Sequence, residues 1–246
     1  MIGDEEGVDI PTKITPCPVV EAIVELRFQA EFPDEAVFGV IYNSFHNETG
    51  EIEKLPILQL PESIRSTDPN LIYKPHYRLR TGEYTIQIGP KVFSLANINE
   101  YVGWDTFSTV IDNKLQKLFN LGIIKSIERF GLRYINLFSD MNIYEKSTLK
   151  IHLGENNQYR NKINLTMAMP TGDFLSKLIL VNNAEVKLQL KEKTVKGSLL
   201  DIDVALEKKI NIKKITGIVE QAHNEEKKLF FSLLNPDFLE TLNPDY

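Results

Sequence analysis

Two long amphipathic helices, each preceded by a run of strands, constrain the fold of this 246-residue chain more than any other feature. Apolar residues recur at intervals of three and four over residues 104–118, and Gly122 is placed to end the predicted helix. A second helix is predicted over residues 216–234. The strands lack regular strand–helix–strand alternation, which argues against a doubly wound parallel sheet. We therefore predict an α+β fold of antiparallel sheets, each packed by a long amphipathic helix. The repeated order suggests an internal duplication.

The predicted strands differ in what their two faces carry. Over residues 20–28, apolar side chains alternate with Glu21, Glu25 and Arg27, which is typical of a half-buried strand. Both faces are apolar in residues 126–138, which predicts a central strand. Other strands are predicted at residues 73–80, 84–96, 162–169, 177–190 and 199–206. A helix is expected to begin after Pro33.

The chain is expected to divide into a lead-in and two halves. Residues 1–17 mix acidic residues, glycine and proline without periodicity, so they are predicted to form a mobile N-terminal lead-in. Residues 18–138 form the first α+β half, and residues 139–246 form the second, packed with the first as one unit.

Composition and local sequence patterns indicate the cellular compartment of the protein. A single cysteine, Cys17, excludes a disulfide framework. Residues 1–10 contain no lysine or arginine, so they do not resemble a signal peptide. The longest apolar stretch is far shorter than the roughly 20 residues that span a bilayer. We therefore expect a cytoplasmic protein without a membrane partner.

The motifs of several enzyme classes are missing. The four histidines lie far apart in sequence, so no zinc motif is present. The chain contains no glycine-rich phosphate-binding loop and no Gly-x-Ser-x-Gly nucleophile motif, and Cys17 lies between prolines with no base fixed beside it. These observations argue against a nucleotide-driven motor, an α/β-hydrolase and a cysteine protease. They predict no metal and no cofactor.

Carboxylates and arginines on two strands are the remaining candidates for chemistry. If the strands of residues 20–28 and 126–138 are neighbours, Glu25 can pair with Arg133 on a shared face, and such pairs are usually structural. In an enzyme, Glu21 or Glu25 would act as a general base and Arg133 would hold an anion. Arg27 and Arg129 are further candidates for binding.

A basic stretch raises nucleic-acid binding as another alternative. Residues 187–214 contain eight lysines and four acidic residues, whereas the whole chain has a net charge of −6. The candidate contacts are Lys208, Lys209, Lys213 and Lys214. They are not interleaved with aromatic residues, and the overall negative charge argues against high affinity.

Four stretches resemble a sporadically distributed family of uncharacterised bacterial proteins of similar length. These stretches are residues 18–28 (PVVEAIVELRF), 103–107 (GWDTF), 129–136 (RFGLRYIN), and Ala222-His223 followed by Phe230 or Phe231. The family has no established activity to carry over. Its patchy occurrence resembles that of genes in mobile or defence-related clusters, which is the only context that the resemblance implies.

The absence of a catalytic set favours a non-enzymatic protein-interaction component. Such a protein would bind a protein partner or itself through sheet edges or exposed grooves. The first alternative is an enzyme or small-anion-binding protein that uses the strand residues Glu21, Glu25 and Arg133. The second alternative is nucleic-acid binding through the lysine patch.

Overall fold

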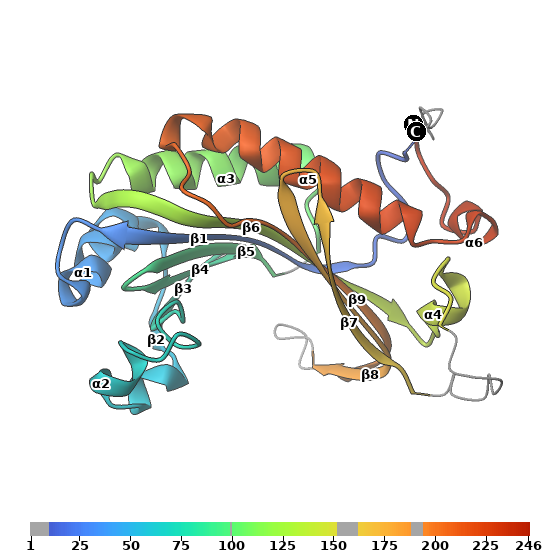
Figure 1. Cartoon of the computed structure of the whole chain (residues 1–246), viewed down its shortest axis with the longest axis horizontal. Coiled ribbons are helices and arrows are strands. Elements are labelled where there is room, and N and C mark those ends of the chain that lie inside the picture. Colours follow the sequence, from blue (N-terminus) through green and yellow to red (C-terminus); the bar gives the residue numbers. More distant parts are fainter. Residues whose placement is uncertain (1–9, 99, 152–161, 188–193) are drawn as a thin grey trace.

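The computed structural model describes residues 10–98, 100–151, 162–187 and 194–246, and these residues form a nine-stranded antiparallel sheet with helices (Figure 1). The strand order is β2-β3-β4-β5-β1-β6-β9-β8-β7. The strands are β1 (Val19–Ala30), β2 (Ile52–Lys54), β3 (Tyr77–Thr81), β4 (Tyr84–Gly89), β5 (Val92–Asn97), β6 (Ile124–Ser139), β7 (Asn164–Thr171), β8 (Phe174–Lys187) and β9 (Thr194–Leu206). The α-helices are α1 (Asp34–Phe45), α2 (Glu62–Arg65), α3 (Trp104–Phe119), α4 (Ile143–Lys146), α5 (Ile215–Ser232) and α6 (Pro236–Glu240). The predicted α+β class and antiparallel pairing are confirmed.

Strands from both predicted halves belong to this one sheet. β1 and β6 are adjacent at its centre, and Glu25 of β1 lies opposite Gly131 of β6. β1 also pairs with β5 of the first half, while β6 pairs with β9 of the second half. The sequence left open whether the two halves share one sheet, and the β1–β6 ladder joins the strands of both halves into one.

One face of the sheet is covered by helices and holds the core. Figure 1 shows α3 and α5 side by side above the sheet. Ala22, Val24 and Leu26 of β1 are buried on this face, as the alternation predicts. The apolar stripe of α3 is buried too, and Gly122 adopts a positive φ of 64° just after the helix, as its predicted role requires.

The other face carries no long helix among the described residues. In Figure 1 the segment with β2 and α2 lies below one end of the sheet, and the lower end of the β7–β8 hairpin extends below the other. Glu21, Glu25 and Arg27 of β1 point to this side, because the opposite side of the strand faces the core. We call this the helix-free face.

The N-terminal segment differs from the sequence prediction. Of the predicted lead-in, residues 1–9 lie outside the described residues. Lys13 instead forms a β-bridge with Asp245, the backbone of Thr15 donates a hydrogen bond to Leu242, and Ile14 is buried. Contacts with the C-terminal segment, which sequence periodicity does not reveal, therefore hold this part of the chain.

None of the helices in the described part of the chain has the length and apolar character needed to cross a membrane.

Candidate functional site

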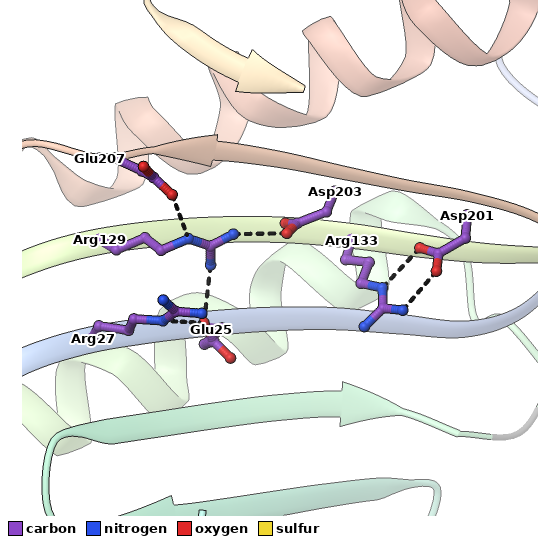
Figure 2. A network of polar contacts seen from close by, with 7 residues as sticks. All are labelled: Glu25, Arg27, Arg129, Arg133, Asp201, Asp203 and Glu207. Atoms are coloured by element: carbon purple, nitrogen blue, oxygen red, sulfur yellow. Dashed lines mark hydrogen bonds and ion pairs between the residues drawn. The ribbon is translucent and has the colours of Figure 1, made fainter. Parts of the chain in front are cut away.

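A buried arginine lies at the centre of a charged network on the helix-free face (Figure 2). Arg129 of β6 donates from Nη1 to Glu25 Oε1 at 2.9 Å and from Nη2 to Asp203 Oδ2 at 2.7 Å. Its Nε lies 3.5 Å from Glu207 Oε1. Arg27 donates from Nε to the same Glu25 oxygen at 2.8 Å. β1, β6 and the end of β9 thus hold one guanidinium among three carboxylates, and such charge-assisted bonds fix its orientation.

Gly131 makes room for this arrangement. A Cβ at Gly131 would lie 2.4 Å from Nη1 of Arg129 and 3.0 Å from its Cζ, well inside van der Waals contact. The guanidinium therefore lies directly over the Gly131 backbone, two residues along the same strand face. In the sequence Arg-Phe-Gly-Leu-Arg, the glycine leaves this space for the first arginine because it has no side chain.

Arg133 forms a second, simpler ion pair beside the first. Its Nε and Nη2 donate to the two oxygens of Asp201 at 2.7 and 2.6 Å, a bidentate geometry. Asp201 is buried, whereas the Arg133 side chain is 41% exposed. Hydrogen bonding to Asp201 raises the pKa of Arg133 still further. Arg133 thus keeps its charge and presents part of its guanidinium to solvent.

These residues, apart from Asp201 and Glu207, line a cavity of about 570 Å³ on the helix-free face. Ile23, Arg133, Asp203 and Lys177 form a continuous row across β1, β6, β9 and β8. The wall opposite this floor comes from the segment before β3. The full lining is Glu21, Ile23, Glu25, Arg27, Pro69, Asn70, Tyr73, Lys74, Pro75, Gln87, Ser94, Ala96, Arg129, Gly131, Arg133, Ile135, Lys177 and Asp203.

Two acids of this cavity hold protons more tightly than usual. Burial raises the pKa of Asp203, and the attraction of Arg129 only partly opposes this shift. Burial likewise raises the pKa of Glu21 against the attraction of Arg133. Carboxyls shifted in this direction can exchange protons closer to neutral pH, which acid–base chemistry requires. Arg133 and Lys177 could hold an anion beside them.

The structure brings together the strand residues that the sequence singled out. Glu21, Glu25, Arg27, Arg129 and Arg133 all line the cavity. The expected pairing of Glu25 with Arg133 does not form, because β1 and β6 place Glu25 opposite Gly131 and within reach of Arg129. Asp201 takes the place of Glu25 as the partner of Arg133.

The lysine patch lies elsewhere and is not a single surface of free cations. Lys208 pairs with Asp173 at 3.0 Å, and Lys196 pairs with Glu185 at 3.0 Å. Lys209 follows β9, while Lys213 and Lys214 precede α5 in a short 3-10 turn. Two further lysines of the basic stretch at residues 187–214, Lys191 and Lys193, lie outside the described residues.

Sequence reasoning missed two acids of the network, Asp201 and Asp203. The strand of residues 199–206 that carries them was predicted, but nothing local identifies it as the neighbour of β6. Tyr73 and Lys74 were assigned to a strand, whereas they precede β3 and line the cavity. Alternating acids on one strand and arginines on another were the available signal.

Other residues from the resemblance meet on the opposite face of the sheet. The ring of Trp104 at the start of α3 stacks on His223 of α5, with centroids 3.7 Å apart. The Tyr134 hydroxyl lies 3.4 Å from Nδ1 of His223 and 3.0 Å from the Tyr101 hydroxyl. Burial lowers the pKa of His223 to about 4. This cluster joins the two long helices to β6.

Comparison with known proteins gives no assignment, because no family model and no curated protein sequence matches the chain. Within the described residues, no three histidine, cysteine or carboxylate side chains are grouped so that they could hold a metal ion. The case for a function therefore depends on the geometry of the cavity.

Proposed function

We propose that this protein binds a small anionic molecule in the cavity on the helix-free face. The observation that carries the proposal is the convergence of five cationic side chains on one cavity, against three acidic ones. The cations are Arg27, Lys74, Arg129, Arg133 and Lys177, and the acids are Glu21, Glu25 and Asp203. The volume of about 570 Å³ lies within the range of small-molecule sites.

The cations of this cavity serve two purposes. Arg129 is surrounded by carboxylates and holds the floor together. Lys74 and Lys177 form no ion pair with any residue that the structure describes, and both are exposed. Arg133 binds Asp201 through Nε and Nη2, which leaves Nη1 without a carboxylate partner among the described residues. These three side chains supply the donors that an anion would contact.

An internal duplication, as the sequence suggests, would place this site on the axis between the halves. The duplication would align Leu26-Arg27-Phe28 of β1 with Leu132-Arg133-Tyr134 of β6. In this alignment Glu25 corresponds to Gly131, and these two residues are cross-strand partners. Glu25 pairs with Ser94 of β5 and Gly131 pairs with Ala205 of β9, so Ser94 corresponds to Ala205. Trp104 and Ile215, the first residues of α3 and α5, lie equally far along the sequence from Ser94 and Ala205, respectively. Strand order, register and helix starts therefore support a duplication whose axis passes through the cavity floor.

Titration with citrate and pyrophosphate by calorimetry at low ionic strength tests the proposal. We expect one-to-one binding of at least one anion. Lys177→Ala should weaken it about tenfold or more, because a charged hydrogen bond contributes about 1.5–3 kcal/mol. Arg133→Ala should also weaken it. Arg80→Ala is the matched control, since this arginine of β3 pairs with Glu53 of β2 and does not line the cavity.

Two results would count against this function. One is the absence of saturable binding of either anion to the folded wild-type chain. The other is binding that Lys177→Ala and Arg133→Ala leave unchanged. The Lys177 variant is the more decisive, because its side chain has no ion pair to lose within the described part of the chain and circular dichroism should show an unchanged fold.

A second candidate function is self-association through the edge strand β7. Its eight residues carry no charge and all are at least partly exposed, including Met167 at 38%. The opposite edge, β2, has only three residues, and its Glu53 pairs with Arg78 and Arg80. Natural sheets protect their edges with short strands, charges and proline. β2 is short and charged, whereas β7 is longer and uncharged and carries one proline, Pro170, near its end. Antiparallel pairing of β7 with β7 of a second copy would place no like charges opposite each other.

Sedimentation or light scattering tests this second candidate. The wild-type chain should form a dimer at micromolar concentrations, and Met167→Lys should make it monomeric by placing two lysines close together at the centre of the paired edges. Ile52→Lys is the control, because Ile52 is an equally exposed apolar residue on the other edge. A monomeric wild type, or a dimer that tolerates Met167→Lys, would refute pairing through β7.

A further inference from the structure

A second cavity, of about 220 Å³, lies between α1, the segment around α2 and the turn that joins β4 to β5. It shares no lining residue with the larger cavity. Phe38, Leu58 and Ile72 give it an apolar wall, while Arg65, His76 and Lys91 supply nitrogen atoms. A compact space with an apolar wall and a few polar groups is typical of a small-ligand site.

The geometry fixes the protonation of His76. Nη1 of Arg65 lies 3.3 Å from Nδ1 of His76, and a guanidinium can only donate. Nδ1 must therefore be the unprotonated acceptor, which leaves the proton of the neutral ring on Nε2. Burial and the charge of Arg65 lower the pKa of His76, which agrees with a neutral ring.

The Nε2–H of His76 is available to a ligand. The residue is 8% exposed and its backbone is held by hydrogen bonds with Ile88 and Leu55. Nε2 has no hydrogen-bond partner among the described residues. It is also not one of the polar atoms that are both buried and unpaired, so Nε2 is accessible to solvent. Because this nearly buried ring lines the cavity, its accessible N–H opens to the cavity.

Arg65 adds a positive charge that no carboxylate neutralises within the described residues. Its Nε donates to the carbonyl of Leu60 at 3.3 Å, and Nη1 donates to His76. Lys91 lies at the edge of ion-pair distance from Asp34, at 4.0 Å. The cavity thus offers a guanidinium and a neutral N–H donor together.

The acidic residues of this cavity limit the charge of its ligand. Asp34, Glu35 and Glu62 also line it, and Glu35 and Glu62 are exposed to solvent. Three carboxylates would repel a polyanion, whereas one carboxylate can be neutralised by Arg65. We propose that this second cavity binds a small apolar monocarboxylate, whose carboxylate accepts hydrogen bonds from Arg65 and from Nε2 of His76.

Titration of the isotope-labelled chain with isovalerate and with its neutral analogue isovaleramide, followed by NMR, tests this proposal. We expect saturable shifts of the Ile72, His76 and Tyr77 amides with isovalerate, and binding of isovaleramide at least about tenfold weaker. Arg65→Gln should weaken isovalerate binding to the level of the amide. Arg80→Gln, an exposed arginine outside both cavities, should leave it unchanged.

The comparison of acid with amide needs no variant, so it remains decisive if Arg65→Gln fails to fold. Equal binding of the two compounds would overturn the proposal, and so would the absence of saturable shifts. Shifts confined to the larger cavity, abolished by Lys177→Ala, would assign the carboxylate to that site and overturn this one.

Discussion

Replacing Arg129 with methionine is expected to lower the free energy of unfolding at pH 7 by about 3–5 kcal/mol. The Arg129 side chain is 10% exposed and contacts Glu25, Asp203 and Glu207. Methionine resembles the aliphatic part of arginine but carries no guanidinium and no charge, so the substitution leaves carboxylates on the helix-free face without their shared partner. Urea unfolding at pH 7 measures the effect.

The pH dependence separates this effect from simple loss of packing. Arg129 lowers the pKa of Asp203, so its removal raises that pKa further. A carboxyl with a raised pKa in the folded state favours folding more as the pH falls. The deficit of Arg129→Met should therefore shrink between pH 7 and pH 4, whereas a packing defect would persist.

Two further variants bracket the result. Gly131→Ala keeps every charge but places a methyl group where the Arg129 guanidinium lies, so it should give part of the same loss. Arg80→Met removes an exposed arginine with one ion pair and should cost less than about 1 kcal/mol. A loss below about 1 kcal/mol for Arg129→Met would show that the network does not hold the central strands together.

The sequence predicts the faces of the central strands but not their register. Alternation in residues 20–28 correctly assigns Glu21, Glu25 and Arg27 to the face away from the core. Register depends on pairings between distant strands, and a small shift changes every cross-strand partner. The prediction therefore paired Glu25 with Arg133, whereas the ladder gives Glu25 to Arg129.

The long helices were predicted well because their periodicity is a local property of the sequence. The predicted starts of α3 and α5 agree with the structure within one residue. The connection of two strand runs into one sheet is not local, and neither is the segment before β3 that closes the cavity. The helix pattern also gave no indication that Glu226, an acidic residue of α5, is buried in the structure.

Glu226 should make the protein lose stability as the pH rises from 6.5 to 8. The residue is 6% exposed on α5, and burial raises its pKa to about 8. Glu226 interacts electrostatically with Tyr101 and Tyr134, whose pKa values burial raises. Those groups do not titrate below pH 8, so Glu226 determines the slope there.

The sign follows from the protons bound in each state. An unfolded glutamate loses its proton near pH 4.5, while the folded protein keeps it up to about pH 8, so stability falls with pH in between. His223 acts oppositely between its ordinary pKa of 6.5 and its lowered pKa of about 4, where stability rises with pH. The two slopes offset each other below pH 6.5. Above it, the loss from Glu226 should approach about 1.4 kcal/mol per pH unit.

Substitution at Glu226 provides the test. Glu226→Leu should continue the apolar stripe formed by Val219, Ala222 and Phe230, and it should stabilise the chain by about 2–4 kcal/mol at pH 8 but much less at pH 5. Glu226→Gln should remove the slope between pH 6.5 and 8. Glu225→Gln, on the same helix in an ion pair with Lys228, should keep the wild-type slope. A flat wild-type profile over this range, together with no gain from Glu226→Leu at pH 8, would mean that Glu226 reaches water in the folded protein.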